Sequence, residues 1–298
     1  MNENYGAVQV PLAVLWTNPG EKRPHDQLIL SPVPDATAWA DTMDTDMRLW
    51  LVGKVETQLL YGEPVVILDR QGDWLQVAAL EQPTSVHSSG YPGWLPASQV
   101  AENSAYLEDR LHSPLVAVTA DKATLCHPSA PTTLVSYQTK LPLVKEAGVF
   151  TVRLPNGSTG QLATEQAAKI APSFDPEAMI QEAKKFIGLR YLWGGTSSFG
   201  FDCSGFVMRL YGSQGITIPR DANDQANAGE PVNSQNLRSG DLLFFADDNG
   251  QGSIHHVGMY MADGIMIHAP NSKSAVREEP FMSGTYGPEF WGARRYLK

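Results

Sequence analysis

The sequence predicts a multidomain protein in which two small β-barrels precede an α+β domain. Residues 51–100 alternate apolar and polar positions in short runs between glycine turns, which is typical of small β-barrels. Residues 114–170 repeat this pattern more weakly, and a helix followed by mixed helices and strands begins near residue 175. We therefore expect domains at residues 1–105, 106–172 and 173–298.

The first predicted barrel has turns at residues 61–64 and 70–73, between strands. It also carries a helical insertion at about residues 35–53, because the stretch DATAWADTMDTDMRLW (35–50) has helical periodicity and Asp35 can cap it. The apolar face of this helix, which we interpret as core packing, consists of Trp39, Met43, Met47 and Trp50. The residues before position 35 are broken by prolines, and we expect strands and loops there.

The second predicted barrel has a hairpin turn at Pro155-Asn156-Gly157. Its segment 148–153 aligns with segment 72–77 of the first barrel, so the two barrels look like degenerate copies of one module. Both resemble the bacterial SH3 domain, in which a pattern GDW…V…GYxGW recurs. The first copy has this pattern, whereas the second lacks both tryptophans.

The third domain opens with the helix DPEAMIQEAKKFIG, which Asp175 can cap and Gly188 can end. Its buried stripe is predicted to be Met179, Ala183, Phe186 and Ile187.

Composition limits the classes of partner. The formal net charge of −10 disfavours nucleic acid and anionic membranes, and no apolar run reaches the roughly 18 residues of a membrane-spanning helix. Two cysteines do not form a disulfide framework in 298 residues. The first residues lack the pattern of a signal peptide. We expect a cytoplasmic protein, the alternative being a secreted or cell-wall protein whose leader was removed.

Cys203 lies between a glycine-rich turn and an apolar helical stretch that ends at Gly212. A cysteine at a helix N-terminus is stabilised as a thiolate by unpaired N–H groups and the helix dipole, so we expect a lowered thiol pKa. Asp202 can cap the helix, and its charge would partly oppose this effect. Cys203 is therefore a candidate nucleophile, although a lone cysteine is more often buried and inert.

Two predicted strands carry histidines twelve residues apart, His256 and His268, on either side of a turn near residues 262–264. If the connection has an odd number of residues, Gly258 pairs with His268 and both imidazoles share a face; a strict two-residue turn would separate them. We expect the odd connection. One imidazole could then take the thiol proton while the other orients it. His255 would point to the opposite face.

Five ordered motifs over residues 175–298 resemble the NlpC/p60 family of bacterial cysteine peptidases, which have a papain-like core and act on peptidoglycan peptides. The motifs are YLWGG (191–195), FDCSGF (201–206), GDL (240–242), HVGMY (256–260) and MIHA (266–269). The resemblance implies Cys203 as nucleophile, His256 as base and His268 as the orienting residue. It also implies Tyr191 as a donor to the oxyanion, together with the backbone N–H of Cys203. It implies no cofactor and no metal.

The complete layout resembles the subgroup with two SH3 domains, which cuts the bond between γ-D-Glu and a diamino acid in murein peptides with a free N-terminal L-Ala. In that subgroup an acidic residue and a tyrosine of the first SH3 domain close the pocket over the amine, which implies Glu56 and Tyr91 here. Asp202 and Ser204 would complete the amine site. Ala222 stands where the family often has serine, which bears on specificity. The sequence does not fix the diamino acid, the oligomeric state, or a role in recycling rather than in wall turnover. We expect a monomer that recycles cell-wall peptides.

Three other functions are alternatives to a cysteine peptidase. A zinc site at Cys203, His256 and His268 lacks paired ligand spacing and a fourth ligand. A cell-wall-binding SH3 protein with an inert third domain would not need an intact Cys/His/His set. An acyltransferase or amidase on the same core would need an acyl pocket, which the polar, acidic flanks do not favour.

Overall fold

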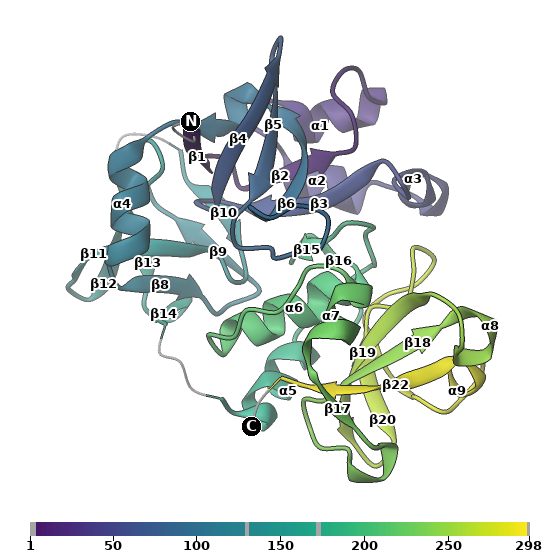
Figure 1. Cartoon of the computed structure of the whole chain (residues 1–298). Coiled ribbons are helices and arrows are strands. Elements are labelled where there is room, and N and C mark those ends of the chain that lie inside the picture. Colours follow the sequence, from purple (N-terminus) through teal and green to yellow (C-terminus); the bar gives the residue numbers. More distant parts are fainter. Residues whose placement is uncertain (1–3, 129–130, 171–173, 297–298) are drawn as a thin grey trace. The chain divides into compact units, whose positions relative to one another are not determined.

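The computed structural model describes residues 4–128, 131–170 and 174–296 and divides into two compact units (Figure 1). The first unit comprises residues 1–171 with the short segment 197–199, and the second comprises residues 172–196 and 200–298. The predicted boundary between the last two domains, at residues 172 and 173, lies outside the described residues. Among the described residues, no helix is both long and apolar enough to cross a membrane.

The first barrel is an antiparallel sheet with the strand order β3-β2-β6-β5-β4-β1-β7. Its strands are β1 (Asn4–Val8), β2 (Leu12–Trp16), β3 (Val55–Leu60), β4 (Pro64–Gln71), β5 (Trp74–Ala79), β6 (Tyr91–Pro96) and β7 (Val100–Ala101). The predicted turns separate β3 from β4 and β4 from β5. Gly62 and Gly72 have φ of 84° and 58° there, a conformation that glycine adopts without steric cost. Leu75 and Val77 alternate with less buried residues along β5 and pack into the barrel core.

The helical insertion contains η1 (Pro24–Asp26), α1 (Gln27–Leu30), α2 (Ala36–Asp41) and α3 (Thr45–Trp50). The prediction of one helix over residues 35–50 is wrong. Asp44 has an extended backbone and accepts a hydrogen bond from the N–H of Met47, so it caps a second helix. Asp35 caps α2 as expected. Of the predicted apolar face, Trp39 and Met43 are buried, while Met47 and Trp50 are partly buried. Helix α1 lies where strands and loops were predicted.

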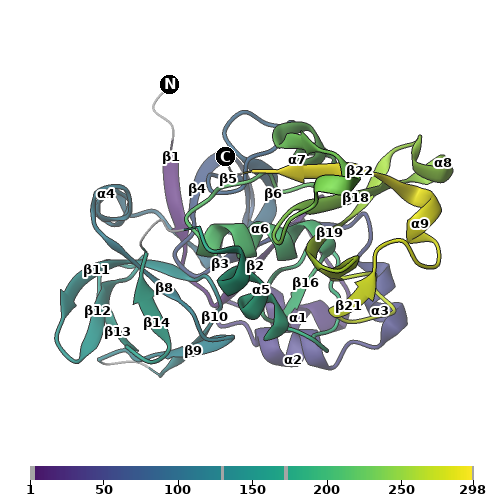
Figure 2. The ribbon, with the colours of Figure 1, turned by 90° about the horizontal axis from the view of Figure 1, so that it is seen from below.

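The second barrel combines a sheet of order β13-β12-β11-β8-β14 with a two-stranded sheet, β10-β9 (Figure 2). Its strands are β8 (Leu115–Val118), β9 (Lys122–Leu125), β10 (Thr133–Ser136), β11 (Lys140–Glu146), β12 (Val149–Arg153), β13 (Thr159–Ala163) and β14 (Ala167–Lys169). The predicted hairpin turn at residues 155–157 lies between β12 and β13. The first barrel ends with η2 (Ala97–Gln99) and β7, and α4 (Ser104–His112) connects the two barrels. The hydroxyl of Tyr106 in α4 donates to the carbonyl of Gly62.

The second unit is built on a sheet of order β17-β22-β18-β19-β20-β21. The strands of this sheet are β17 (Glu230–Val232), β18 (Leu242–Ala246), β19 (Ile254–Ala262), β20 (Ile265–His268), β21 (Arg277–Pro280) and β22 (Phe290–Arg295). A separate two-stranded sheet consists of β15 (Thr196–Ser197) and β16 (Gly200–Phe201). The helices of the second unit are α5 (Pro176–Lys184), α6 (Cys203–Ser213), α7 (Ala222–Ala228), η3 (Ser234–Asn236), α8 (Asp247–Gly250) and α9 (Tyr286–Glu289). Helix α6 packs against β19 and β20, α7 packs against β19, and α5 packs against α6 (Figure 1).

Helix α5 begins as predicted, because Asp175 accepts hydrogen bonds from the N–H groups of Glu177 and Ala178. It ends at Lys184, four residues before the predicted Gly188. Hydrogen bonds between residues three apart tighten the chain after Lys184. This change of pitch turns Ile187 outward, where it is 50% exposed, so its assignment to the buried stripe is wrong. The other predicted stripe residues, Met179, Ala183 and Phe186, are buried.

Candidate active site

Cys203 is the first residue of α6, as its position before the apolar helical stretch predicts. Asp202 caps the helix by accepting a hydrogen bond from the N–H of Gly205 at 2.7 Å. The preceding turn packs tightly on this helix start: a Cβ at Gly205 would lie 2.1 Å from the carbonyl oxygen of Gly195. Gly195 also accepts a hydrogen bond from the N–H of Asp202. The glycines therefore permit the close approach that presents Cys203 at the end of the helix.

The hairpin of β19 and β20 brings His256 and His268 onto one face. The turn is a two-residue one, Asp263-Gly264, so the predicted three-residue connection over residues 262–264 is wrong. A β-bulge at Met261 supplies the extra residue, because Tyr260 pairs with Met266 while Ala262 pairs with Ile265. The two histidines therefore share a face, as they would across a connection with an odd number of residues.

The two buried imidazoles make direct contact. His256 Nε2 lies 2.8 Å from His268 Nδ1, and the ring centroids are 5.0 Å apart at 70°. Packing of α6 on β19 places the thiol beside the same strand, where the backbone N–H of Val257, the residue after His256, hydrogen-bonds to the Cys203 sulfur. The structure therefore gathers the three residues in one region of the second unit.

Burial determines the protonation of Cys203 and His256. It raises the pKa of Cys203 to about 12, with the charge of Asp202 adding to the rise and the Val257 N–H, Arg220 and the Ser204 N–H opposing it. The expectation of a lowered thiol pKa is wrong, since desolvation outweighs the helix N-terminus. Burial also lowers the pKa of His256 well below its usual 6.5, as does the charge of His268. At neutral pH the resting pair is a thiol and an uncharged imidazole, which can accept a proton.

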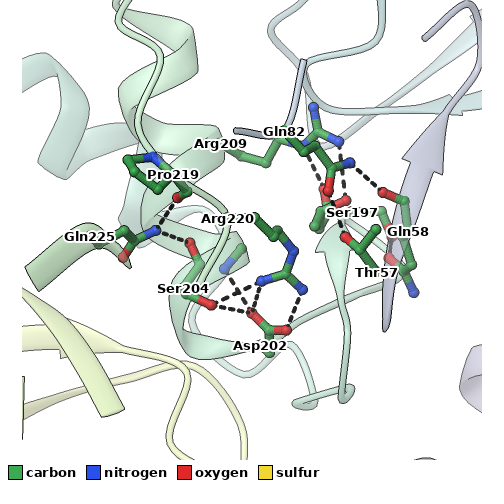
Figure 3. A network of polar contacts seen from close by, with 12 residues as sticks. Thr57, Gln58, Gln82, Ser197, Asp202, Ser204, Arg209, Pro219, Arg220 and Gln225 are labelled. Carbon is green, nitrogen blue, oxygen red and sulfur yellow. Dashed lines mark hydrogen bonds and ion pairs between the residues drawn. The ribbon is translucent and has the colours of Figure 1, made fainter. Parts of the chain in front are cut away.

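Arg220 organises the residues on either side of Cys203 (Figure 3). Its Nη2 donates to Asp202 Oδ2 at 2.5 Å, and its Nη1 donates to Ser204 Oγ at 2.9 Å and to Asp202 Oδ1 at 3.2 Å. Gln225 Nε2 donates to the carbonyls of Ser204 and Pro219. Arg220, Asp202 and Ser204 form what we call the Arg220 cluster, and all three are buried. The guanidinium of Arg220 therefore compensates the Asp202 charge next to the thiol.

Three protein-family models match parts of the chain. Residues 188–295 match the NlpC/P60 family model, residues 53–100 match the model for the bacterial dipeptidyl-peptidase Sh3 domain, and residues 118–169 match the YKFC SH3b2 domain model. A γ-D-glutamyl-L-lysine dipeptidyl-peptidase of Bacillus cereus is 42% identical to the chain, over 97% of the chain and 90% of that protein. The chain belongs to the NlpC/P60 family.

Two further comparisons extend over nearly the whole chain. A γ-D-glutamyl-L-lysine dipeptidyl-peptidase of Bacillus subtilis is 36% identical, over 95% of the chain and 96% of that protein. The crystal structure of a Bacillus cereus NlpC/P60 family protein has a TM-score of 0.95 and 40% identity, covering 99% of this chain and 100% of that one. The predicted fold class, two bacterial SH3 domains followed by an NlpC/P60 domain, is confirmed.

Within the NlpC/P60 domain, Tyr191 lies close enough to Cys203 for the charges of Cys203 and Asp202 to act on it. Burial, followed by these two charges, raises the pKa of Tyr191 well above 10. The phenol therefore keeps its proton at neutral pH and can donate a hydrogen bond. Its backbone N–H donates to the carbonyl of Ser274, which fixes the chain at this point.

Glu56 and Tyr91, the other residues assigned from the family resemblance, belong to the first unit. Glu56 is partly buried on β3, and Tyr91 is buried as the first residue of β6. The same unit contains the segment 197–199, in which Ser197 Oγ donates to Gln58 Oε1 at 2.7 Å (Figure 3). The roles of Glu56 and Tyr91 toward a substrate stay predictions.

Three residues beside the imidazoles were missed by the sequence analysis. Glu279 Oε2 lies 3.1 Å from His268 Nε2, and Arg277 donates two hydrogen bonds to the same oxygen. The ring of Tyr286 in α9 contacts both imidazoles. Arg277 and Glu279 are two residues apart on β21 and so share a face, but the sequence does not show which strand β21 pairs with.

The zinc site considered as an alternative would use Cys203, His256 and His268. Within the parts of the chain that the structure describes, no group of three or more His, Cys, Asp or Glu side chains is placed to hold a metal ion. Both ring nitrogens of His268 are within hydrogen-bonding distance of protein groups, since Nδ1 lies beside His256 and Nε2 lies beside Glu279.

Proposed function

We propose that this protein is a cysteine peptidase that hydrolyses the γ-D-Glu–diamino acid bond of murein peptides with a free N-terminal L-Ala, releasing L-Ala-γ-D-Glu. The observation that carries the proposal is the contact of His256 with His268 beside a helix-terminal cysteine. The names of the two curated relatives support L-Lys as the diamino acid.

The proposed reaction starts from the neutral pair. Cys203 Sγ attacks the γ-carbonyl carbon as its proton passes to His256, so a thiolate need not exist in the resting enzyme. The developing oxyanion accepts hydrogen bonds from the Tyr191 hydroxyl and the Cys203 N–H. The imidazolium of His256, held by His268, then protonates the leaving amine, and a thioester remains. Water attacks this thioester with His256 as base, which releases the carboxylic acid and restores the thiol.

Recognition of the free amine is the less direct part of the proposal. An ammonium group needs carboxylate and hydroxyl acceptors, and Asp202 and Ser204 flank the nucleophile. Because Arg220 already pairs with Asp202, a further carboxylate would strengthen ammonium binding, and Glu56 with Tyr91 supplies it in our proposal. A blocked N-terminus would be rejected, because it has no ammonium to donate hydrogen bonds and would leave these carboxylate and hydroxyl acceptors unpaired.

The same preference suggests where the enzyme acts. In intact murein the L-Ala nitrogen is acylated, so a reaction that frees this amine has to precede the peptidase. We propose that the substrates are small released peptides and that the enzyme works on them in the cytoplasm, as a monomer. Assaying soluble and extracellular fractions of the source cells for dipeptide release tests the compartment.

The decisive experiment is digestion of L-Ala-γ-D-Glu-L-Lys and its meso-diaminopimelate analogue, with the products identified by mass spectrometry. We expect L-Ala-γ-D-Glu and the free diamino acid, and no product from the N-acetylated peptide or from Cys203→Ala. Cleavage by Cys203→Ala would contradict the cysteine mechanism, and equal cleavage of acetylated peptide would contradict recognition of the amine.

A further inference from the structure

The geometry points to Glu279 as a positioning residue that fixes the tautomers of His268 and His256, so that the base nitrogen of His256 is free to take the thiol proton. The inference rests on the roles proposed above for Cys203, His256 and His268. It adds Glu279, held by Arg277, as a positioning residue to the three catalytic residues.

The contacts form a continuous chain. His268 is fully buried and uses both ring nitrogens: Nδ1 lies 2.8 Å from His256 Nε2, and Nε2 lies 3.1 Å from Glu279 Oε2. Arg277 Nε and Nη2 donate to this same Oε2 at 2.9 and 2.8 Å. The β20–β21 ladder sets these positions, because it pairs His268 with Arg277 and Met266 with Glu279.

The direction of each hydrogen bond follows from the chemistry of Glu279. An oxygen that receives two guanidinium donors is a carboxylate acceptor, so His268 Nε2 carries the hydrogen. In a neutral imidazole the other nitrogen, Nδ1, is then an acceptor, and His256 Nε2 has to be the donor. Neutral His256 therefore has its hydrogen on Nε2 and a free lone pair on Nδ1, which can accept the proton of Cys203.

Without the Glu279 acceptor, the hydrogen bond between the two imidazoles could reverse its direction. His268 could hold its hydrogen on Nδ1, His256 Nε2 would become the acceptor, and His256 Nδ1 would carry a hydrogen. That tautomer cannot act as a base toward the thiol. The role resembles that of any outer hydrogen-bond partner that orients a functional imidazole.

Burial keeps His268 uncharged at neutral pH, because it lowers the pKa of this imidazole to about 4. Glu279 opposes this effect, and the positive charge of Arg277 adds to it. Arg277 and Glu279 on β21 face the two imidazoles, and the ring of Tyr286 on α9 contacts both of them. Cys203 lies on the neighbouring helix α6, and His255, on the opposite face of β19, acts on His256 through its charge alone. Among them, Glu279 is the carboxylate within hydrogen-bonding distance of an imidazole nitrogen of this pair.

The first test compares the variants Glu279→Ala, Glu279→Gln and Glu278→Ala in the full chain. Glu278 is the matched control, because it lies on the same strand, faces the other way and pairs with Lys184. We expect Glu279→Ala to lower kcat by about 10- to 100-fold with KM little changed, the usual cost of losing an outer orienting partner. Glu279→Gln, whose amide oxygen can still accept from His268, should restore most of kcat, and Glu278→Ala should match wild type.

The second test needs no variant. Nitrogen-15 NMR of histidine-labelled wild-type protein reports which ring nitrogen carries hydrogen, and we expect Nε2–H on both His256 and His268. Hydrogen on Nδ1 of His268, or wild-type kcat in folded Glu279→Ala, would overturn the inference while leaving the peptidase intact. Activity that persists in Cys203→Ala would instead overturn the proposed function.

Discussion

His256 Nε2 and His268 Nδ1 are 2.8 Å apart because the bulge at Met261 compensates for a two-residue turn. Without the bulge, the two side chains would lie on opposite faces of the sheet. The position of the bulge is thus coupled to the chemistry, as bulges beside functional sites often are.

The contact between His256 and His268 predicts unequal effects for substitutions of His268 and His255. His268→Ala should lower kcat by about 10²- to 10⁴-fold, because the base loses its orienting partner. His255→Ala should retain kcat, since His255 points away and contacts Glu289 at 3.4 Å. Steady-state kinetics on the tripeptide, with thermal unfolding to verify folding, measures both; equal losses in the two variants would contradict the assignment.

Burial of the histidines predicts acid sensitivity. The folded-state pKa values of His256 and His268 lie below 6.5, so the unfolded chain binds these protons first as the pH falls. The stability from their burial is present above pH 6.5 and is lost below it, by at most about 1.4 kcal/mol per pH unit for each group. Urea unfolding between pH 7 and 4.5 should show this slope, and His268→Asn should reduce it. A slope that stays the same in His268→Asn would mean that burial of this imidazole is not the source of the acid sensitivity.

The local parts of this fold are predictable from sequence, and the long-range parts are not. Asp175 and Asp202 are local signals, and each helix begins where its cap indicates. By contrast, the contact of Glu279 with His268 depends on which strand β21 pairs with. The thiol pKa was predicted with the wrong sign because the helix end is visible in the sequence, whereas the burial around Cys203 is not.

The Arg220 cluster predicts a large, non-additive loss of stability. Arg220→Met leaves the buried Asp202 charge without its partner, which should cost about 3–5 kcal/mol. Asp202→Asn in the same chain removes that charge and should recover part of the loss, because only the amide remains to be satisfied. A double-mutant cycle by urea unfolding measures the coupling, and strictly additive effects would show that the two side chains do not depend on each other.

Amine recognition predicts a change in binding with little change in chemistry. Glu56→Ala should raise KM for L-Ala-γ-D-Glu-L-Lys more than it lowers kcat, because the carboxylate would contact the ammonium in both the ground state and the transition state. The loss should correspond to about 1.5–3 kcal/mol, the value of a hydrogen bond to a charged group. Glu102→Ala is the matched control, since Glu102 is an exposed glutamate of the same unit that pairs with Arg70. An N-acetylated peptide should be a poor substrate for wild type and Glu56→Ala alike, so a variant that lost activity equally toward free and acetylated peptides would show that Glu56 acts on something other than the amine.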